Sequence, residues 1–278
     1  MEILIAFLVM LAASLVAGAL LLVFSHFFAV EKNVLEKAVR ECLPGINCGA
    51  CGYKGCDDYA AALAAKEAKP NLCIPGDQRV ADEISNLLGV EKAEIEDVVA
   101  FVACDGRYDA TSHVAKYEGV STCRAASMLY GGPNACRYGC LGFGDCAAIC
   151  PSGAIYKVDG IARVDTSLCV GCGLCAQTCP KGIIHMLPQE AAVAVMCNNK
   201  QKGAEARKVC ANACIACKKC EKSCPHGAIT VTDNLAVVDY NKCTGCGVCV
   251  GVCPTGCLKK TCFPDIPENF EIPVERTV

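Results

Sequence analysis

The spacing of the cysteines constrains the fold of this chain more than any other feature. The chain has 27 cysteines among 278 residues and no tryptophan, a composition typical of a cross-linked or metal-bound scaffold. A single large core would need more bulky apolar side chains, so several small units organised by cysteine chemistry are expected. The formal net charge of −3 lacks the basic excess of a nucleic-acid-binding domain.

Three segments have the spacing Cys-x2-Cys-x2-Cys-x3-Cys-Pro, which is typical of bacterial ferredoxins. They begin at Cys169, Cys214 and Cys243. In such a run three thiolates hold one [4Fe-4S] cluster and the fourth reaches a second cluster. Zinc sites pair two cysteines with a distant second pair, so zinc is the weaker interpretation of these runs.

A fourth cysteine group is explained by an internal repeat. A shift of 74 residues superposes Cys136, Cys140, Cys146 and Cys150 on Cys210, Cys214, Cys220 and Cys224. Under this shift Cys217 falls on Phe143, so the first copy lacks that ligand and Cys136 is its nearest replacement. In the second copy Cys210 competes with Cys217, which is preferred because it completes the regular run.

Cross-ligation within each copy predicts the ligand sets. The first copy is expected to hold one cluster at Cys136, Cys140, Cys146 and Cys179 and another at Cys150, Cys169, Cys172 and Cys175. The second copy is expected to use Cys214, Cys217, Cys220 and Cys253 for one cluster and Cys224, Cys243, Cys246 and Cys249 for the other.

A separate four-cysteine group precedes the repeat and consists of Cys48, Cys51, Cys56 and Cys73. Glycines between these ligands allow the backbone to wrap closely around an inorganic cluster, although zinc could also use four thiolates. Five [4Fe-4S] clusters would use 20 of the 27 cysteines. The others are interpreted as buried free thiols: Cys42, Cys104, Cys123 (which falls on Cys197 under the shift), Cys197, Cys210, Cys257 and Cys262. A sixth cluster built from them is the alternative, although they form no ligand run.

The N-terminal segment has a different composition from the rest. Residues 3–24 contain no charged side chain, and about 20 apolar residues suffice to cross a bilayer. A cleaved signal peptide would need a positive n-region, whereas the only early charge is Glu2. Lys32, Lys37 and Arg40 follow the apolar run, which places the large C-terminal part in the cytoplasm. Dense cysteines in that reducing compartment favour metal ligands, and a secreted disulfide scaffold of inverted topology is the alternative.

No nucleotide, flavin or acid/base signature accompanies the cysteines. Glycine patterns at Gly142 and Gly171 formally match a dinucleotide fingerprint but are interrupted by cluster cysteines. We therefore predict no catalytic residue and interpret the chain as an electron conductor. Between Cys197 and Cys224 there are seven Lys and Arg residues against two Glu. This surface either docks an acidic electron donor by electrostatic steering or is a solvated face.

The predicted fold class is α+β with a transmembrane helix, a four-Cys [4Fe-4S] domain and two tandem ferredoxin-like 2[4Fe-4S] modules. The expected boundaries are 1–30 for the anchor, 31–90 for the four-Cys domain, 91–133 for a connector, 134–188 for the first module, 189–262 for the second module and 263–278 for a Pro-containing tail.

The order of these motifs resembles the B subunit family of the Rnf ion-translocating electron-transport complex. The resemblance is carried by the apolar N-terminus, by LPGINCGACGYKGC at residues 43–56, by GCLGFGDC at residues 139–146 and by the ferredoxin runs. It implies an electron-relay subunit of a ferredoxin:NAD⁺ oxidoreductase, a translocase that moves Na⁺ or H⁺. Expected partners are soluble ferredoxin, membrane lipid and the other subunits of the complex, which carry the flavins.

The resemblance also implies a single-pass protein of the cell (inner) membrane with its iron-sulfur domains on the cytoplasmic side. Not every member of the family has the second ferredoxin module. Two other interpretations remain open on the sequence: a membrane-anchored polyferredoxin subunit of another anaerobic reductase, and an iron-sulfur redox sensor.

Overall fold

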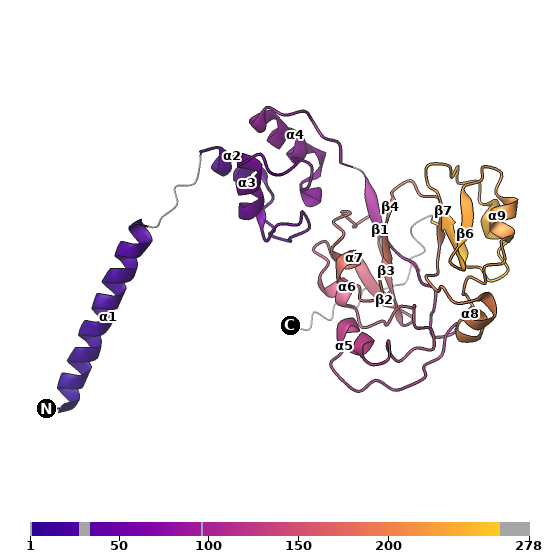
Figure 1. The fold of residues 1–278 in the computed structure, drawn as a ribbon, viewed down its shortest axis with the longest axis horizontal. Coiled ribbons are helices and arrows are strands. Elements are labelled where there is room, and N and C mark those ends of the chain that lie inside the picture. Colours follow the sequence, from indigo (N-terminus) through magenta and orange to yellow (C-terminus); the bar gives the residue numbers. More distant parts are fainter. Residues whose placement is uncertain (1, 28–33, 96, 262–278) are drawn as a thin grey trace.

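The computed structural model describes residues 2–27, 34–95 and 97–261, which form short helices and strands between cysteine loops (Figure 1). Cys262 and the predicted tail at 263–278 lie outside the described residues. The helices are α1 (Glu2–Phe27), α2 (Val34–Cys42), α3 (Cys56–Ala64), the 3-10 helix η1 (Ile74–Gly76), α4 (Asp77–Leu88), α5 (Cys123–Met128), α6 (Asp145–Ala148), α7 (Leu174–Thr178), α8 (Gly203–Val209), α9 (Lys219–Ser223) and α10 (Val248–Gly251). The strands are β1 (Val98–Val102), β2 (Ile155–Val158), β3 (Ile161–Val164), β4 (Ile184–Pro188), β5 (Val193–Val195), β6 (Ile229–Thr232), β7 (Leu235–Val238) and β8 (Leu258–Lys260).

The expected anchor segment forms one helix, α1, of 26 residues. Across the described residues, no helix qualifies in length and apolarity as a membrane span.

The four-Cys domain is a small helical unit. The helices α2, α3 and α4 pack around an apolar core that includes Val39, Tyr59, Leu63 and Ile84. The helix α4 ends at Gly89, whose φ of 63° is the left-handed conformation favoured at a helix C-terminus. In the chain, the four cysteines of this domain lie between α2 and α4.

The two modules share one architecture, as the repeat predicts. In the first, β2 and β3 form a hairpin with Ile155 opposite Val164, and in the second, β6 and β7 place Ile229 opposite Val238. The two-residue turn of the first hairpin is Asp159-Gly160, with φ of 48° and 80°, which suits the right-handed twist of the strands. The same hairpin therefore follows the first cluster loop in each module.

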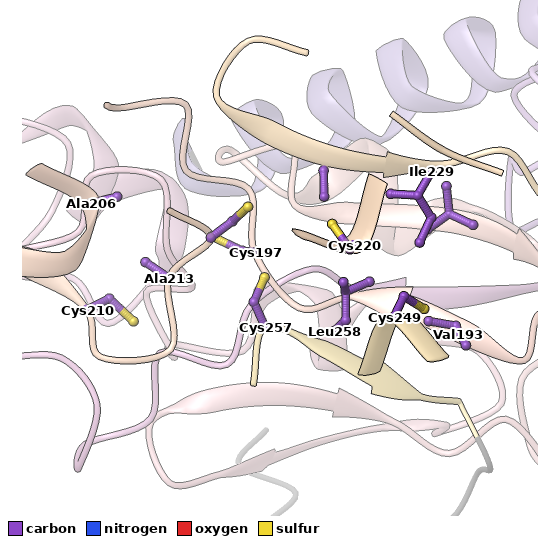
Figure 2. Packing of buried hydrophobic residues seen from close by; sticks show 13 residues of the cluster. Val193, Cys197, Ala206, Cys210, Ala213, Cys220, Ile229, Cys249, Cys257 and Leu258 are labelled. Carbon is purple, nitrogen blue, oxygen red and sulfur yellow. The ribbon is translucent and has the colours of Figure 1, made fainter. Parts of the chain in front are cut away.

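Each module has a second pair of strands that closes it. The strand β1 pairs with β4, and β5 pairs with β8. Because β1 falls within the expected connector at 91–133, part of that connector packs into the first module. Figure 2 shows the core of the second module, where Val193, Ile229 and Leu258 pack beside Cys220 and Cys249.

The strand pairs also identify equivalent residues of the two modules that the constant 74-residue shift does not match. Val102 pairs with Ile184, and Val195 pairs with Leu258, 74 residues beyond Ile184. Cys104 and Cys197 each come two residues after these counterpart strand ends. The structural counterpart of Cys197 is therefore Cys104 and not Cys123, since the first module has a longer segment after its first strand.

Candidate iron-sulfur centres

The four predicted cysteines of the helical domain lie together, and we call them site A: Cys48, Cys51, Cys56 and Cys73. Burial and the three neighbouring thiols raise the pKa of Cys73 to about 11, while a hydrogen bond from the backbone N–H of Gly76 opposes that rise. The loop is held by Asn47, whose Oδ1 accepts the N–H of Cys56 at 2.8 Å. Four thiols and a backbone donor are a suitable ligand set for a cubane.

Site B contains the second predicted set of the first module: Cys150, Cys169, Cys172 and Cys175. Burial, with Cys172, Cys169 and Cys150 as neighbours, raises the pKa of Cys175 to about 11. The strand β1 supplies a donor, since the N–H of Ala100 lies 3.4 Å from the sulfur of Cys169. Cys48 of site A is also close enough to raise the pKa of Cys172, after burial and nearer thiols. Sites A and B are therefore neighbours.

Site C differs from the set expected on the sequence. A cavity is lined by Cys123, Cys140, Cys146 and Cys179, and Cys136 is not among its lining residues. Burial, followed by Cys140, Cys123, Cys179 and Cys175, raises the pKa of Cys146 to about 12. Three of the predicted cysteines are thus brought together, and Cys123 occupies the position that was assigned to Cys136.

The reason is a tether between α5 and α6. The backbone N–H groups of Cys123 and Arg124 donate to the two carboxylate oxygens of Asp145, at 2.8 and 3.1 Å, and Thr122 caps α5. Because Asp145 precedes Cys146 on α6, the tether holds Cys123 beside the cluster loop. The sequence shows that Phe143 stands where the second copy has Cys217, so a ligand is missing there. No regular spacing indicates that Cys123, 20 residues earlier, replaces it.

The second module brings its predicted cysteines together. Site D is a cavity lined by Cys214, Cys217, Cys220 and Cys253, and the Cys257 thiol is also on its wall. At site E, Cys224, Cys243 and Cys249 are neighbours, and the fourth predicted cysteine, Cys246, lies between Cys243 and Cys249 in the same loop. Burial and the nearby Cys243 and Cys224 raise the pKa of Cys249, and Cys246 is the exposed member of that loop.

A repeated backbone hydrogen bond supports cluster binding at these sites. At four of these cysteines, the sulfur accepts a hydrogen bond from the backbone N–H of the residue two positions later. The pairs are Cys140–Gly142, Cys172–Leu174, Cys214–Ala216 and Cys253–Thr255. Hydrogen bonds to sulfur are one means by which proteins tune iron-sulfur clusters. The donor sets therefore fit [4Fe-4S] clusters.

A site for one metal ion is a different arrangement. Among the residues that the structure describes, no group of three or more Cys, His, Asp or Glu side chains converges on a position for a single ion. A cubane instead offers a separate iron atom to each thiolate, so its ligand sulfurs surround it.

The basic segment of the second module is exposed. Lys218 precedes α9 with its side chain 56% accessible, and Lys219 and Lys222 on α9 are also exposed. Cys217, which lines site D, is exposed beside them. The positive charge therefore surrounds a place where a cluster would come close to the protein surface.

Comparison with known families matches three segments of the chain. Residues 43–75 match the family described as "Putative Fe-S cluster", residues 162–185 match a 4Fe-4S binding domain, and residues 213–257 match a 4Fe-4S dicluster domain. These segments contain all of site A, three cysteines of site B, Cys179 of site C, and all of sites D and E. The chain thus has an Fe-S cluster domain and ferredoxin-type 4Fe-4S domains.

Longer similarities extend over most of the chain, to the B subunits of three ion-translocating complexes. It is 45% identical over 93% of its length to that of the proton-translocating ferredoxin:NAD(+) oxidoreductase complex of Clostridium ljungdahlii, covering 88% of that protein. It is 39% identical over 82% of its length to that of the Na(+)-translocating ferredoxin:NAD(+) oxidoreductase complex of Acetobacterium woodii, covering 69% of it. It is 41% identical over 82% of its length to that of the ion-translocating oxidoreductase complex of Methanosarcina acetivorans, covering 86% of it. The chain therefore belongs to the Rnf family of B subunits of ion-translocating ferredoxin:NAD oxidoreductase complexes.

Proposed function

We propose that this chain relays electrons between soluble ferredoxin and flavin or iron-sulfur partners in the membrane, within a complex that couples the transfer to Na⁺ or H⁺ movement. The names of its relatives supply the reaction. The observation that carries the proposal is the adjacency of the thiol sets, with Cys48 of site A beside Cys172 of site B and Cys175 of site B beside Cys146 of site C.

We propose five [4Fe-4S] clusters, one at each of sites A to E. When bound, such clusters take up and release single electrons at potentials between about −700 and +450 mV. The chain contributes the thiolates, the N–H donors to sulfur and the burial that excludes water. In this assignment Cys123 replaces Cys136 at site C, because Cys123 lines the cavity of Cys140, Cys146 and Cys179.

We propose that ferredoxin docks on the second module and that electrons leave from site A toward the membrane partners. The exposed lysines around Cys217 support the docking site, because a positive surface attracts an acidic partner. Site A supports the exit, because its domain follows α1 directly in the chain. The second module lies on the far side of the first module from this domain (Figure 1).

We propose that α1 anchors the chain in the cell membrane with the iron-sulfur domains in the cytoplasm. At 1.5 Å per residue a helix of 26 residues is longer than the ~30 Å of hydrocarbon in a bilayer. The described apolar side chains of α1 are exposed in the isolated chain, for example Phe7, Leu15 and Leu22 at 65, 66 and 74%. Acyl chains are the surroundings that such side chains favour, and a partner helix could cover part of them.

The relay is tested by removing its exit in the assembled complex. With Cys48→Ala and Cys51→Ala, reduced ferredoxin should still bleach the visible absorption of the remaining clusters, while NADH formation falls to background. The matched control is Cys42→Ala, because Cys42 donates to the Ala38 carbonyl and lies outside site A. Undiminished NADH formation in the double variant would show that electrons bypass site A.

A further inference from the structure

A cavity between the two modules is lined by four cysteines that sites A to E do not use. They are Cys104, Cys136, Cys197 and Cys210, and we call this space the interface cavity. It has about 390 Å³ of space between protein atoms, open solvent at its mouth included, compared with about 390 Å³ at site C and 350 Å³ at site D. A space of the size found at the cluster sites therefore lies where the modules meet.

All four cysteines are buried, with exposures of 6, 8, 9 and 8% for Cys104, Cys136, Cys197 and Cys210. They are also mutual neighbours. Burial raises the pKa of Cys104, Cys136 and Cys210 most, and the neighbouring thiols add to the rise. Cys136 raises the pKa of Cys104, Cys197 raises that of Cys136, and both raise that of Cys210. Four thiols from four separate segments thus face one buried space.

Each of the four sulfurs accepts the same backbone hydrogen bond as four of the cysteines at sites B to D, namely Cys140, Cys172, Cys214 and Cys253. The donor is again the N–H two residues later, in the pairs Cys104–Gly106, Cys136–Tyr138, Cys197–Asn199 and Cys210–Asn212. The N–H···S distances are 3.4 Å for Gly106 and 3.4 Å for Asn199. Free buried thiols that merely fill space have no need of this geometry at all four positions.

Further donors and glycines complete the lining. The Asn199 side chain is 1% exposed, and its Nδ2 lies 3.6 Å from the sulfur of Cys136. The N–H of Cys140 donates to Cys104 at 3.3 Å. A side chain at Gly106 or Gly139 would start within 3.7 Å of the Cys104 sulfur. Because glycine has no side chain, both positions leave space open beside the Cys104 sulfur.

The four cysteines form two pairs of counterparts from the two modules. Cys104 and Cys197 each follow the strand that closes a module, two residues after Val102 and Val195. Cys136 and Cys210 are related by the 74-residue repeat. Each module therefore contributes the same two positions, and neither module alone has a complete set of four ligands.

We propose that Cys104, Cys136, Cys197 and Cys210 bind a sixth [4Fe-4S] cluster between the two modules. This assignment explains why Cys136 is absent from site C and why Cys210 is not needed at site D. Zinc is the competing occupant of four thiolates. The cluster is favoured because all four sulfurs share the N–H···S pattern found at one or two cysteines of each of sites B, C and D.

The position of this site would connect the modules, a role that rests on the proposed relay. On one side Cys104 is next to Cys140 of site C. On the other side the Cys257 side chain hydrogen-bonds with both Cys197 and Cys214 of site D. An electron that leaves site D would reduce the sixth cluster, and its transfer to site C would reoxidise that cluster.

Metal and sulfide analysis of the full chain tests the proposal. With every site loaded under anaerobic conditions, we expect about 24 Fe and 24 acid-labile sulfides per chain, from six four-iron clusters. The variant Cys104→Ala/Cys197→Ala should retain about 20 of each, whereas Cys42→Ala should retain about 24.

Two other results would contradict the proposal. If the wild type contains about 20 Fe and the double variant loses none, the sixth site is overturned and the five-cluster relay stays intact. The same conclusion follows if the wild type contains one zinc ion that the double variant lacks. Iron-poor wild-type protein would instead reject the proposed function as a whole. If the double variant does not fold, the wild-type iron and zinc counts decide alone.

Discussion

At the scale of single residues, an N–H group two positions after a cysteine is common to the four cysteines of the interface cavity and to four of the proposed ligands at sites B to D. Burial alone disfavours the thiolate, as shown by the pKa of Cys146, which rises to about 12, and that of Cys220, which rises to about 11. A donor aimed at sulfur offsets part of that cost, and iron replaces the proton when the cluster binds. The turn that aims this donor is therefore part of the ligand site.

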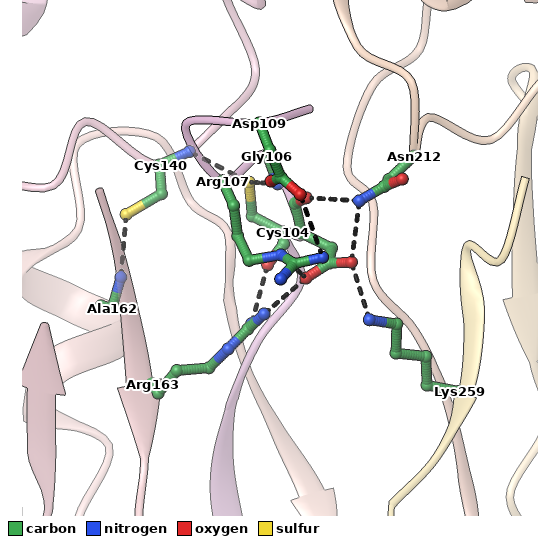
Figure 3. Close-up of polar contacts among 10 residues, drawn as sticks. Cys104, Gly106, Arg107, Asp109, Cys140, Ala162, Arg163, Asn212 and Lys259 are labelled. Carbon is green, nitrogen blue, oxygen red and sulfur yellow. Dashed lines mark hydrogen bonds and ion pairs between the residues drawn. The ribbon is translucent and has the colours of Figure 1, made fainter. Parts of the chain in front are cut away.

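A second residue-scale feature is a buried carboxylate next to the interface cavity. Asp105 has its side chain 1% exposed and pairs with Arg163 at 2.6 Å and Lys259 at 2.7 Å, while Asn212 donates to it at 3.0 Å (Figure 3). Arg163 lies on β3 of the first module and Lys259 on β8 of the second. This ion-pair network therefore fastens the two modules together.

Removing that carboxylate should destabilise the junction. We expect Asp105→Ala to lower the free energy of unfolding by about 3 kcal/mol, since Arg163, Lys259 and Asn212 would together lose a buried acceptor. The matched control is Asp109→Ala, whose side chain is 69% exposed and lies 3.6 Å from Arg107; its loss should cost at most about 1 kcal/mol. Anaerobic thermal unfolding followed by circular dichroism measures both, and equal stability losses would refute the role assigned to Asp105.

At the scale of elements, α9 and the residue before it carry the proposed docking surface. Reversing Lys218, Lys219 and Lys222 to Glu should slow reduction by ferredoxin at low salt by roughly tenfold or more and flatten its salt dependence. The measurement is stopped-flow bleaching of the clusters at several ionic strengths.

The control for this charge reversal is a second triple Lys→Glu variant, which changes the net charge by the same amount outside the second module. Lys66, Lys69 and Lys157 are exposed and lie outside the second module. Their reversal to Glu should leave the ferredoxin rate within about twofold of the wild type, because only local charge steers docking at this face. Similar slowing in both triple variants would assign the effect to net charge and remove the docking surface.

The helix α1 allows a prediction that separates anchoring from cluster binding. Deleting residues 2–30 should move the chain from the membrane fraction to the soluble fraction without changing its iron content, because sites A to E lie beyond that segment. Ultracentrifugation and iron analysis measure the two effects. A deleted chain that still sediments with membranes in the absence of its partner subunits would contradict the proposed anchor.

Local elements followed from the sequence, and long-range pairing did not. The hairpins β2–β3 and β6–β7 and the helix α4 have nearby signals in turn residues, alternation and a terminal glycine. The pairing of β1 with β4 joins Val98 to Pro188 across the whole first module, and no local pattern specifies such a partner. For the same reason Cys123 and the interface cavity were missed: their cysteines converge from distant segments, while the sets at A, B, D and E follow from regular spacing.

At the scale of the whole molecule, the sites form a series. Site A neighbours site B, site B neighbours site C, and α9 of site D packs against α10 of site E. The interface cavity lies between sites C and D, with Cys140 on its wall. The spatial series thus runs from the domain that follows α1 to the second module, which is the arrangement a relay requires, although most cysteines of site C precede those of site B in the chain.

The central claim is that thiolates holding cubanes, and not disulfides or zinc, organise this chain. Electron cryo-microscopy of the anaerobically purified complex tests it most directly. We expect density for a four-iron cluster bonded to each of sites A to E, with Cys123 as the fourth ligand at site C and Cys136 bonded elsewhere. Single metal ions, or cysteines joined in pairs, at these positions would contradict the account.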